Sequence, residues 1–331
     1  MILIGEAEWT FLQPGNVPPH SMTATDKKIT RSEMGQALLR SGYLLEHRVE
    51  TCLRDEHWGY VEANPTYEDP ETGKSREYDV FALKGYLAGP SDHDWLFGVL
   101  LIECVNNPQP LAIITKVPQV GFMHYEEVKL SGLPVKVPAA KTLKGWRGIA
   151  DYLSMKKFHH YCRGRVGTQF CSFAKKKSGK EEEWLALHEG SHFDSFKKLC
   201  DVTEYRIDRH FKSWIIGKRE HLNIEIYYPV IVVQGELVDA HPSRRGVTFR
   251  SSDHIQFRRS VAERGRETNY QIDVIREGFL PHYLAMVDRE LEKTATLLKR
   301  RGIIIRKAIN QILKEASKEG ASGSIRSSFD L

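Results

Sequence analysis

The chain has 331 residues, of which 41% are hydrophobic and 27% charged, a balance typical of a soluble globular protein and not of a disordered chain. Its 48 lysines and arginines against 43 acidic residues give a net charge of +5, which tolerates a polyanionic partner without requiring one. No apolar run approaches the roughly 20 residues of a membrane helix, and no secretory leader is visible, so we expect no membrane partner. The five scattered cysteines indicate reduced thiols and a cytoplasmic location.

The first periodic segment follows an irregular stretch rich in proline. From Gly35 to Leu53 apolar residues such as Leu45 and Val49 recur at helical spacing, which predicts an amphipathic helix. Glu46 lies beside the apolar stripe of that helix and not on the opposite, solvent-facing side. The helix therefore holds a carboxylate next to the expected core.

Two strands are predicted after this helix. Turn-forming residues at 68–73 precede an alternating stretch from Tyr78 to Leu83, which contains Asp79. The run from Trp95 to Val105 is almost wholly apolar, as in a central strand covered on both faces, yet Glu103 lies near its end. A buried, unpaired carboxylate is costly, so we expect Asp79 and Glu103 to converge on a cation such as Mg²⁺. The alternative is that Asp79 and Glu103 are ion-paired residues of the sheet and bind no metal.

This arrangement resembles the PD-(D/E)xK, or restriction-endonuclease-like, nuclease superfamily. The resemblance rests on the order of Glu46 on a helix, Asp79 on one strand and Glu103 to Val105 on the next, within the stretch from Gly42 to Asn107. It implies an α/β fold with a central mixed β-sheet flanked by helices. It also implies metal-dependent endonuclease activity on DNA, or less often on RNA.

The resemblance also assigns roles to individual residues. Asp79 and Glu103 would hold Mg²⁺ or Mn²⁺, the Cys104 carbonyl would add a ligand, and Glu46 would orient a water molecule or a second ion. The lysine that the family places two residues after the glutamate is replaced here by Val105. That lysine orients the attacking water and stabilises charge on the phosphate, which valine cannot do.

Three interpretations of this replacement stay open. Lys84 or Lys116 could supply the missing cation from elsewhere, and we include Lys116 among the expected catalytic residues. Alternatively, the metal alone activates the water. In the third interpretation the site is catalytically inactive, and the protein is a nucleic-acid-binding module that keeps the nuclease fold.

The expected domain organisation follows from these assignments. Residues 1–28 form an N-terminal arm, and residues 29–235 form the nuclease-like core, with a long insertion at about 116–215. Residues 236–316 complete the core with strands and a long helix, and residues 317–331 form a flexible tail. The long helix could cover the sheet or pair with a second subunit as a homodimer.

A basic segment between 151 and 180 is a candidate nucleic-acid surface, because cations neutralise phosphates while interleaved aromatic rings stack on bases. A solvated loop is the alternative. His159, His160, Cys162 and Cys171 lie in the same segment, but their spacing matches no common zinc site. The cations of this segment are Lys156, Lys157, Arg163, Arg165, Lys175, Lys176 and Lys177.

A second enzyme class is suggested by the stretch from His188 to His192, which spells H-E-x-x-H, the zinc-binding motif of metalloproteases. The motif needs a helix, and Gly190 weakens one. We therefore rank a zinc protease below a nuclease as the predicted function.

The C-terminal part contains further predicted elements. Residues 223–233 form a strand, in which Pro229 indicates a bulge or an edge position. Short strands are expected at 254–258 and 270–275, followed from Gly278 by a helical pattern that breaks near Gly302.

Overall fold

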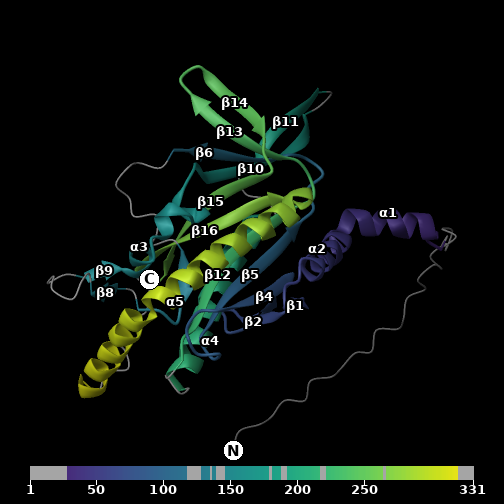
Figure 1. Ribbon diagram of the computed structural model, residues 1–331. Coiled ribbons are helices and arrows are strands. Elements are labelled where there is room, and N and C mark those ends of the chain that lie inside the picture. The colour runs from purple at the N-terminus through teal and green to yellow at the C-terminus, as the bar shows by residue number, and fades with distance from the viewer. Residues whose placement is uncertain are drawn as a thin grey trace, which may run out of the picture.

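The computed structural model describes residues 28–117, 128–134, 136–138, 146–178, 181–187, 192–216, 221–263 and 266–319. They form an α/β body around a mixed sheet of 12 strands, flanked by helices that include the long helix α5 (Leu280–Glu319) (Figure 1). The fold class predicted from the sequence is confirmed. Most of the expected N-terminal arm and C-terminal tail lies outside the described residues.

The sheet brings together strands from the whole described chain. The sheet is mixed. β5 (Trp95–Val105) runs parallel to β12 (Asn223–Val233), which runs parallel to β16 (Arg266–Arg276), whereas β4 (Val80–Leu87) is antiparallel to β5. The main path runs in the order β1 (Tyr60–Ala63), β4 (Val80–Leu87), β5 (Trp95–Val105), β12 (Asn223–Val233), β16 (Arg266–Arg276), β15 (His254–Glu263), β10 (Val166–Ser178), β6 (Leu111–Lys116), β13 (Leu237–Ser243) and β14 (Gly246–Ser251). Two strands branch from this path: β11 (Glu181–Leu187) pairs with β10, and β7 (Lys129–Ser131) pairs with β12. Two small hairpins lie apart from it, β2 (Thr66–Glu68) with β3 (Ser75–Glu77) and β8 (Lys136–Pro138) with β9 (Trp146–Gly148).

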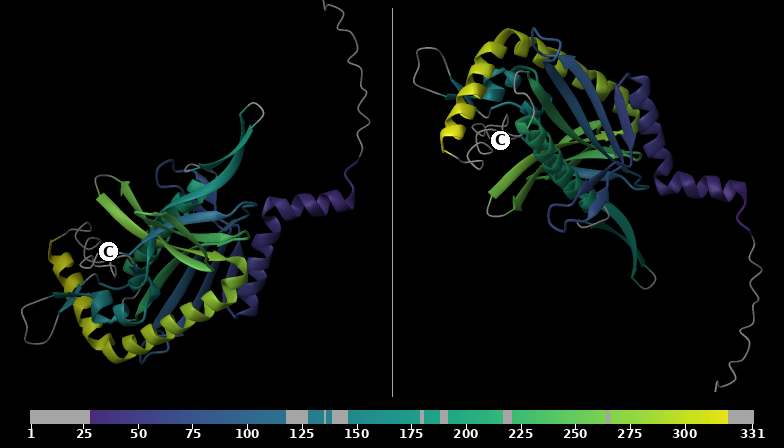
Figure 2. Two further views of the ribbon diagram at one scale, coloured as in Figure 1. Left: turned by 90° about the horizontal axis from the view of Figure 1, so that it is seen from above. Right: turned by 90° about the horizontal axis from the view of Figure 1, so that it is seen from below.

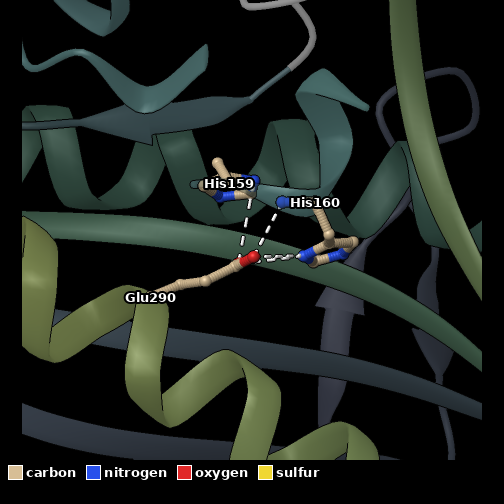
Figure 3. Close-up of side chains that lie close together, drawn as sticks. All are labelled: His159, His160 and Glu290. Atoms are coloured by element: carbon tan, nitrogen blue, oxygen red, sulfur yellow. Dashed lines mark hydrogen bonds and ion pairs between the residues drawn. The ribbon is translucent and has the colours of Figure 1, made fainter. Parts of the chain in front are cut away.

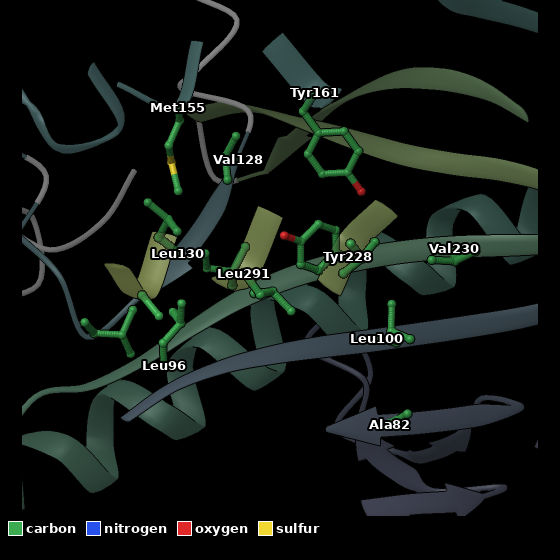
Figure 4. Close-up of a cluster of buried hydrophobic side chains, with 14 of the residues drawn as sticks. Ala82, Leu96, Leu100, Val128, Leu130, Met155, Tyr161, Tyr228, Val230 and Leu291 are labelled. Carbon is green, nitrogen blue, oxygen red and sulfur yellow. The ribbon is translucent and has the colours of Figure 1, made fainter. Parts of the chain in front are cut away.

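The two faces of the sheet are covered by different helices. Leu100 and Ile102 of β5 face a core shared with α5 and α2 (Tyr43–Asp55), part of which Figure 4 shows. Leu101 and Val105 face the other core, which contains apolar residues of α4 (His192–Ile216). Figure 2 shows α5 along one side of the curved sheet and α4 on the other. Burial on both faces explains why β5 and β12 are almost continuously apolar.

The helix predicted from Gly35 to Leu53 is two helices. α1 (Arg31–Ser41) ends and α2 begins at Gly42, whose φ of 88° lies in the left-handed region that favours glycine. The chain turns at Gly42 while apolar residues continue at helical spacing, so the spacing alone predicts one continuous helix. α3 (Ile149–Tyr152) is a single turn that contacts the β8–β9 hairpin.

Pro229 lies in a central strand, so the predicted edge position or bulge is wrong. Its strand, β12, pairs in continuous parallel register with β5, and Pro229 stands opposite Leu101. On the other side of β12, β7 pairs up to Tyr227 and β16 pairs from Val230 onward. The missing N–H of the proline therefore falls in the gap between two partner strands, where no ladder bond is lost.

Two other expectations need correction. The lysine-rich end of β10 is a strand and not a solvated loop, because it forms a hairpin with the glutamates of β11 and pairs Lys177 with Glu182. The last helix does not break near Gly302, since α5 runs through that residue. The segment expected as an insertion includes β10, a strand of the sheet, and α4, which covers one of its faces.

Candidate functional site

Asp79 and Glu103 lie next to each other at one end of the β4–β5 pair. Asp79 directly precedes β4, and β4 pairs with β5 from Val80 opposite Ile102. The side chains that follow Asp79 and precede Glu103 at two-residue spacing, Phe81 and Leu101, belong to the core on the α4 side. Glu103 continues the alternation of Leu101 and therefore points toward α4, and the Asp79 carboxylate lies beside it, since the charge of Lys198 on α4 acts on both carboxylates.

A hydrogen bond from the β5 backbone to the Asp79 side chain holds this carboxylate next to Glu103. The Cys104 N–H donates to Asp79 Oδ2 at 2.6 Å. The Val105 carbonyl accepts from the Gln234 N–H on the β12 side, and successive residues of a strand direct their backbone groups to opposite neighbours. The Cys104 carbonyl is thereby directed to the side of Asp79.

The Glu103 carboxyl is buried beside like charge. Its residue is only 3% exposed, and burial, reinforced by the negative charge of Asp79, raises its pKa to about 7. Burial also raises the pKa of Asp79, against the opposing effect of the Cys104 N–H. Two carboxylates in this setting are destabilised as anions, so the site favours a proton or a cation between them.

A lysine from α4 reaches this pair. Lys198 Nζ lies 2.8 Å from Glu103 Oε1, and Ser195, three residues earlier on the helix, hydrogen-bonds the same carboxylate. A cation thus stands beside Glu103 although Val105 occupies the position where the family pattern has lysine. Lys198 was not among the residues expected from the sequence. Its spacing of four residues from the apolar Val202 places it on the covered side of the helix but does not indicate its partner.

Glu46 lies at the margin of the same site. It is half-buried on α2, and its pKa is raised by burial and then by the charge of Asp79, while the positive charge of Lys198 acts in the opposite direction. In the described part of the chain, two sets of three metal-binding side chains have ligand atoms within 4.8 Å of one another, and neither contains Glu46, Asp79 or Glu103. The structure brings Asp79 and Glu103 together and leaves Glu46 in their electrostatic reach.

The two lysines considered from sequence lie elsewhere. Lys84 is on the opposite face of β4, where its Nζ contacts Asp288 Oδ2 of α5 at 2.6 Å. Lys116 is exposed at the end of β6, which four strands separate from β5 in the sheet order. The structure does not bring Lys116 to the carboxylates.

The predicted nucleic-acid-binding cations do not form one continuous patch. Lys156 and Lys157 are exposed on a short 3₁₀ turn, whereas Arg165 donates to the Thr115 side chain and carbonyl of β6. Exposed Arg163 precedes β10, and Lys175, Lys176 and Lys177 lie near the tip of the β10–β11 hairpin, which projects from the body in Figure 2. Lys175 Nζ contacts Glu182 Oε2 across that hairpin at 3.1 Å.

The H-E-x-x-H stretch falls largely outside the described residues. β11 ends at Leu187 and α4 begins at His192, while residues 188–191 are not described. No helix of the described chain is long and apolar enough to cross a membrane.

Comparison with known proteins adds no assignment to this geometry. No family model matches the chain, and neither the curated proteins nor the solved structures contain a significant match. The site has to be interpreted from its own residues.

Proposed function

We propose that this protein is a metal-dependent nuclease that hydrolyses phosphodiester bonds as an endonuclease on DNA, with Asp79 and Glu103 as its metal ligands. The observation that carries the proposal is Lys198, whose ammonium lies 2.8 Å from Glu103. A cation next to two strand-end carboxylates supplies what Val105 removes from the pattern. The PD-(D/E)xK relationship is part of this proposal.

The residues present fit a hard divalent cation. Asp79 and Glu103 offer carboxylate oxygens, the ligands that Mg²⁺ and Mn²⁺ prefer, and the Cys104 carbonyl is directed to the same side. The raised pKa of Glu103 reflects a negative pair that such an ion would neutralise. When bound, the ion would provide Lewis acidity and a more acidic water molecule.

The side chains around the pair have distinct roles in this proposal. Lys198 holds positive charge where a phosphate oxygen would gain negative charge, and Ser195 fixes the Glu103 carboxylate that it hydrogen-bonds. Glu46, with its raised pKa, is suited to accept a proton from the attacking water. The exposed lysines of the β10–β11 hairpin are proposed to neutralise phosphates of a bound nucleic acid. A homodimer through α5 stays a prediction. The buried stripe of α5 covers the sheet of its own chain, so a second subunit would have to contact another side of the helix.

The test is cleavage of circular and linear, single- and double-stranded DNA and of RNA with Mg²⁺, Mn²⁺ or EDTA. Asp79→Asn should abolish metal-dependent cutting, and Lys198→Met should slow it by about 100-fold or more, as expected for loss of a charge-stabilising group. Lys197→Met is the matched control, because Lys197 contacts Asp201 and Glu71 instead.

The outcomes separate the alternatives. Cutting that survives in Asp79→Asn would remove the proposed site. Binding of nucleic acid without cutting of any substrate would favour the inactive binding module. Equal losses in Lys197→Met and Lys198→Met would mean that the effect is general and that Lys198 has no special role.

A further inference from the structure

A second cluster of potential metal ligands lies on the face of the sheet opposite Glu103. His254 of β15 and Asp273 of β16 face the α5 side, because their neighbours Ile255 and Val274 belong to the core on the α4 side. His160, from a short 3₁₀ turn at His160–Cys162, completes the cluster. The cluster shares no residue with the proposed nuclease site.

The three side chains converge on Asp273. His254 Nε2 lies 2.7 Å from Asp273 Oδ1, and His160 Nε2 lies 3.0 Å from Asp273 Oδ2. One ligand atom from each residue lies within 4.8 Å of the other two. With metal–nitrogen bonds of about 2.0–2.1 Å, donor atoms around a tetrahedral ion are about 3.3 Å apart, so small movements would admit an ion.

An outer layer of hydrogen bonds orients these groups. Glu290 of α5 lies 2.9 Å from His160 Nδ1, and it also accepts the His160 backbone N–H at 2.7 Å (Figure 3). The Tyr283 hydroxyl donates to Asp273 Oδ2 at 2.7 Å. A carboxylate on the far nitrogen of a histidine is the usual outer partner of a metal-bound imidazole.

The charges of the cluster also favour a divalent ion. Asp273 and Glu290 are both buried carboxylates, at 0% and 5% exposure, and they hold His160 between them. Carboxylates only accept, so both ring nitrogens of His160 must donate and the ring carries one positive charge against two negative ones. A divalent ion at His160 Nε2 would balance both carboxylates while Nδ1 keeps its proton for Glu290.

We propose that His160, His254 and Asp273 bind a first-row transition-metal ion such as Zn²⁺, with Glu290 as the residue that positions His160. Two imidazoles and one carboxylate select such an ion over Mg²⁺, which prefers oxygen ligands. Binding releases the Nε2 proton of His160, and His254 coordinates through Nε2 as the tautomer that is protonated at Nδ1. The ion ties the 160–162 turn to β15 and β16 and, through Glu290, to α5.

A neighbouring set of His159, His160 and Glu290 is the weaker choice. His159 Nδ1 already accepts the Tyr161 backbone N–H at 3.3 Å, and His159 is fully buried. His254, in contrast, is partly exposed and gives an ion a route from solvent. The set that includes His254 is therefore the proposed site.

The test uses Co²⁺ as a spectroscopic probe on the full chain after removal of metals with a chelator. One equivalent of Co²⁺ should give visible ligand-field bands, and Zn²⁺ should remove them, whereas Mg²⁺ should not. His254→Ala should weaken Co²⁺ binding by about 100-fold or more, and Glu290→Gln by about 10- to 100-fold, as for the loss of an outer partner. His254→Cys should add a thiolate-to-cobalt charge-transfer band, a gain that a merely misfolded variant cannot give.

Two control variants make the assignment specific. His241 of β13 has similar exposure and a comparable contact, 2.9 Å from its Nε2 to Asp239 Oδ2, so His241→Ala should keep the bands. Glu103→Gln should also keep them. Absence of the bands in the parent protein, their persistence at full affinity in His254→Ala, or their loss in Glu103→Gln would overturn the proposal.

Discussion

At the scale of single residues, the candidate nuclease site depends on a lysine that does not lie on the strand of Glu103. Val105 is buried in the apolar core on the α4 side, and Lys198 brings an ammonium to Glu103 from a different element. In the proposed nuclease, Lys198 supplies the charge that Val105 cannot, because electrostatic stabilisation depends on position in space and not on position in the chain.

A swap of the two positions tests this interpretation. Lys198→Met should lose most cleavage, and the double variant Lys198→Met/Val105→Lys should regain part of it, because residue 105 shares the sheet face of Glu103. Cleavage rates under saturating Mg²⁺ measure the rescue. The gain in cleavage rate from Val105→Lys should be smaller when Lys198 is intact. An equal gain in both backgrounds would show that Lys198 does not supply the missing charge.

The raised pKa of Glu103 predicts a dependence of stability on pH in the absence of metal. The folded protein holds this proton up to about pH 7, whereas an unfolded glutamate releases it near its ordinary pKa of about 4.3. The folded state therefore binds more protons between these values, and the Glu103 contribution to stability falls as the pH rises through this window. Well above pH 7 the loss is complete, and a rise in pKa from about 4.3 to about 7 corresponds to roughly 3–4 kcal/mol.

Glu103→Gln should remove this dependence. In EDTA the variant should gain thermal stability over the parent on going from pH 5 to pH 8, by several degrees in Tm. Parallel thermal melts at both pH values measure the difference, and Glu50→Gln on α2 is the control, because the partly exposed Glu50 carboxylate pairs with Arg54 and not with the site. A constant Tm difference between parent and Glu103→Gln across this range would contradict the assigned pKa.

At the scale of elements, glycines decide where helices turn and where they can pack. Gly42 separates α1 from α2 with a φ of 88°, a conformation that costs other residues roughly 1 kcal/mol or more. Gly35, by comparison, lies within α1 with no neighbouring atom in the way of a Cβ. The same residue type therefore has opposite consequences at two nearby positions.

Two alanine substitutions should shift stability in opposite directions. Gly42→Ala should lower the free energy of unfolding by about 1–2 kcal/mol because alanine resists a positive φ. Gly35→Ala should raise it by up to about 1 kcal/mol because alanine favours the helix. Urea unfolding followed by circular dichroism measures both, and a stabilising Gly42→Ala would show that α1 and α2 form one continuous helix.

At the scale of the whole molecule, the sheet separates two chemical environments. The α4 side contains the carboxylate pair with Lys198, and the α5 side contains the cluster around His160 and Asp273. The close approach of α5 to the sheet holds the second face together. A Cβ on Gly98 of β5 would come within 2.3 Å of Leu291 Cδ1 of α5.

Gly98→Ala should therefore loosen α5 from the sheet. Overpacking of this kind typically costs about 1–3 kcal/mol, which corresponds to a fall of several degrees in Tm for a chain of this size. Thermal melts measure the change, with Gly278→Ala as the control because a Cβ there meets no atom within 4 Å. Equal Tm values for Gly98→Ala and the parent would mean that α5 does not press on β5 at this point.

The sequence by itself determined the features that depend on local pattern. The apolar run of β5, the helical spacing of α2 and α5 and the α/β class follow from periodicity within short segments. Only the tertiary structure decided which distant residues meet. Lys198 reaches Glu103 across 95 positions of the chain (198 minus 103), and His160 meets Asp273 across 113. Such contacts arise from sheet order and helix packing, which involve the whole chain, so no local pattern records them.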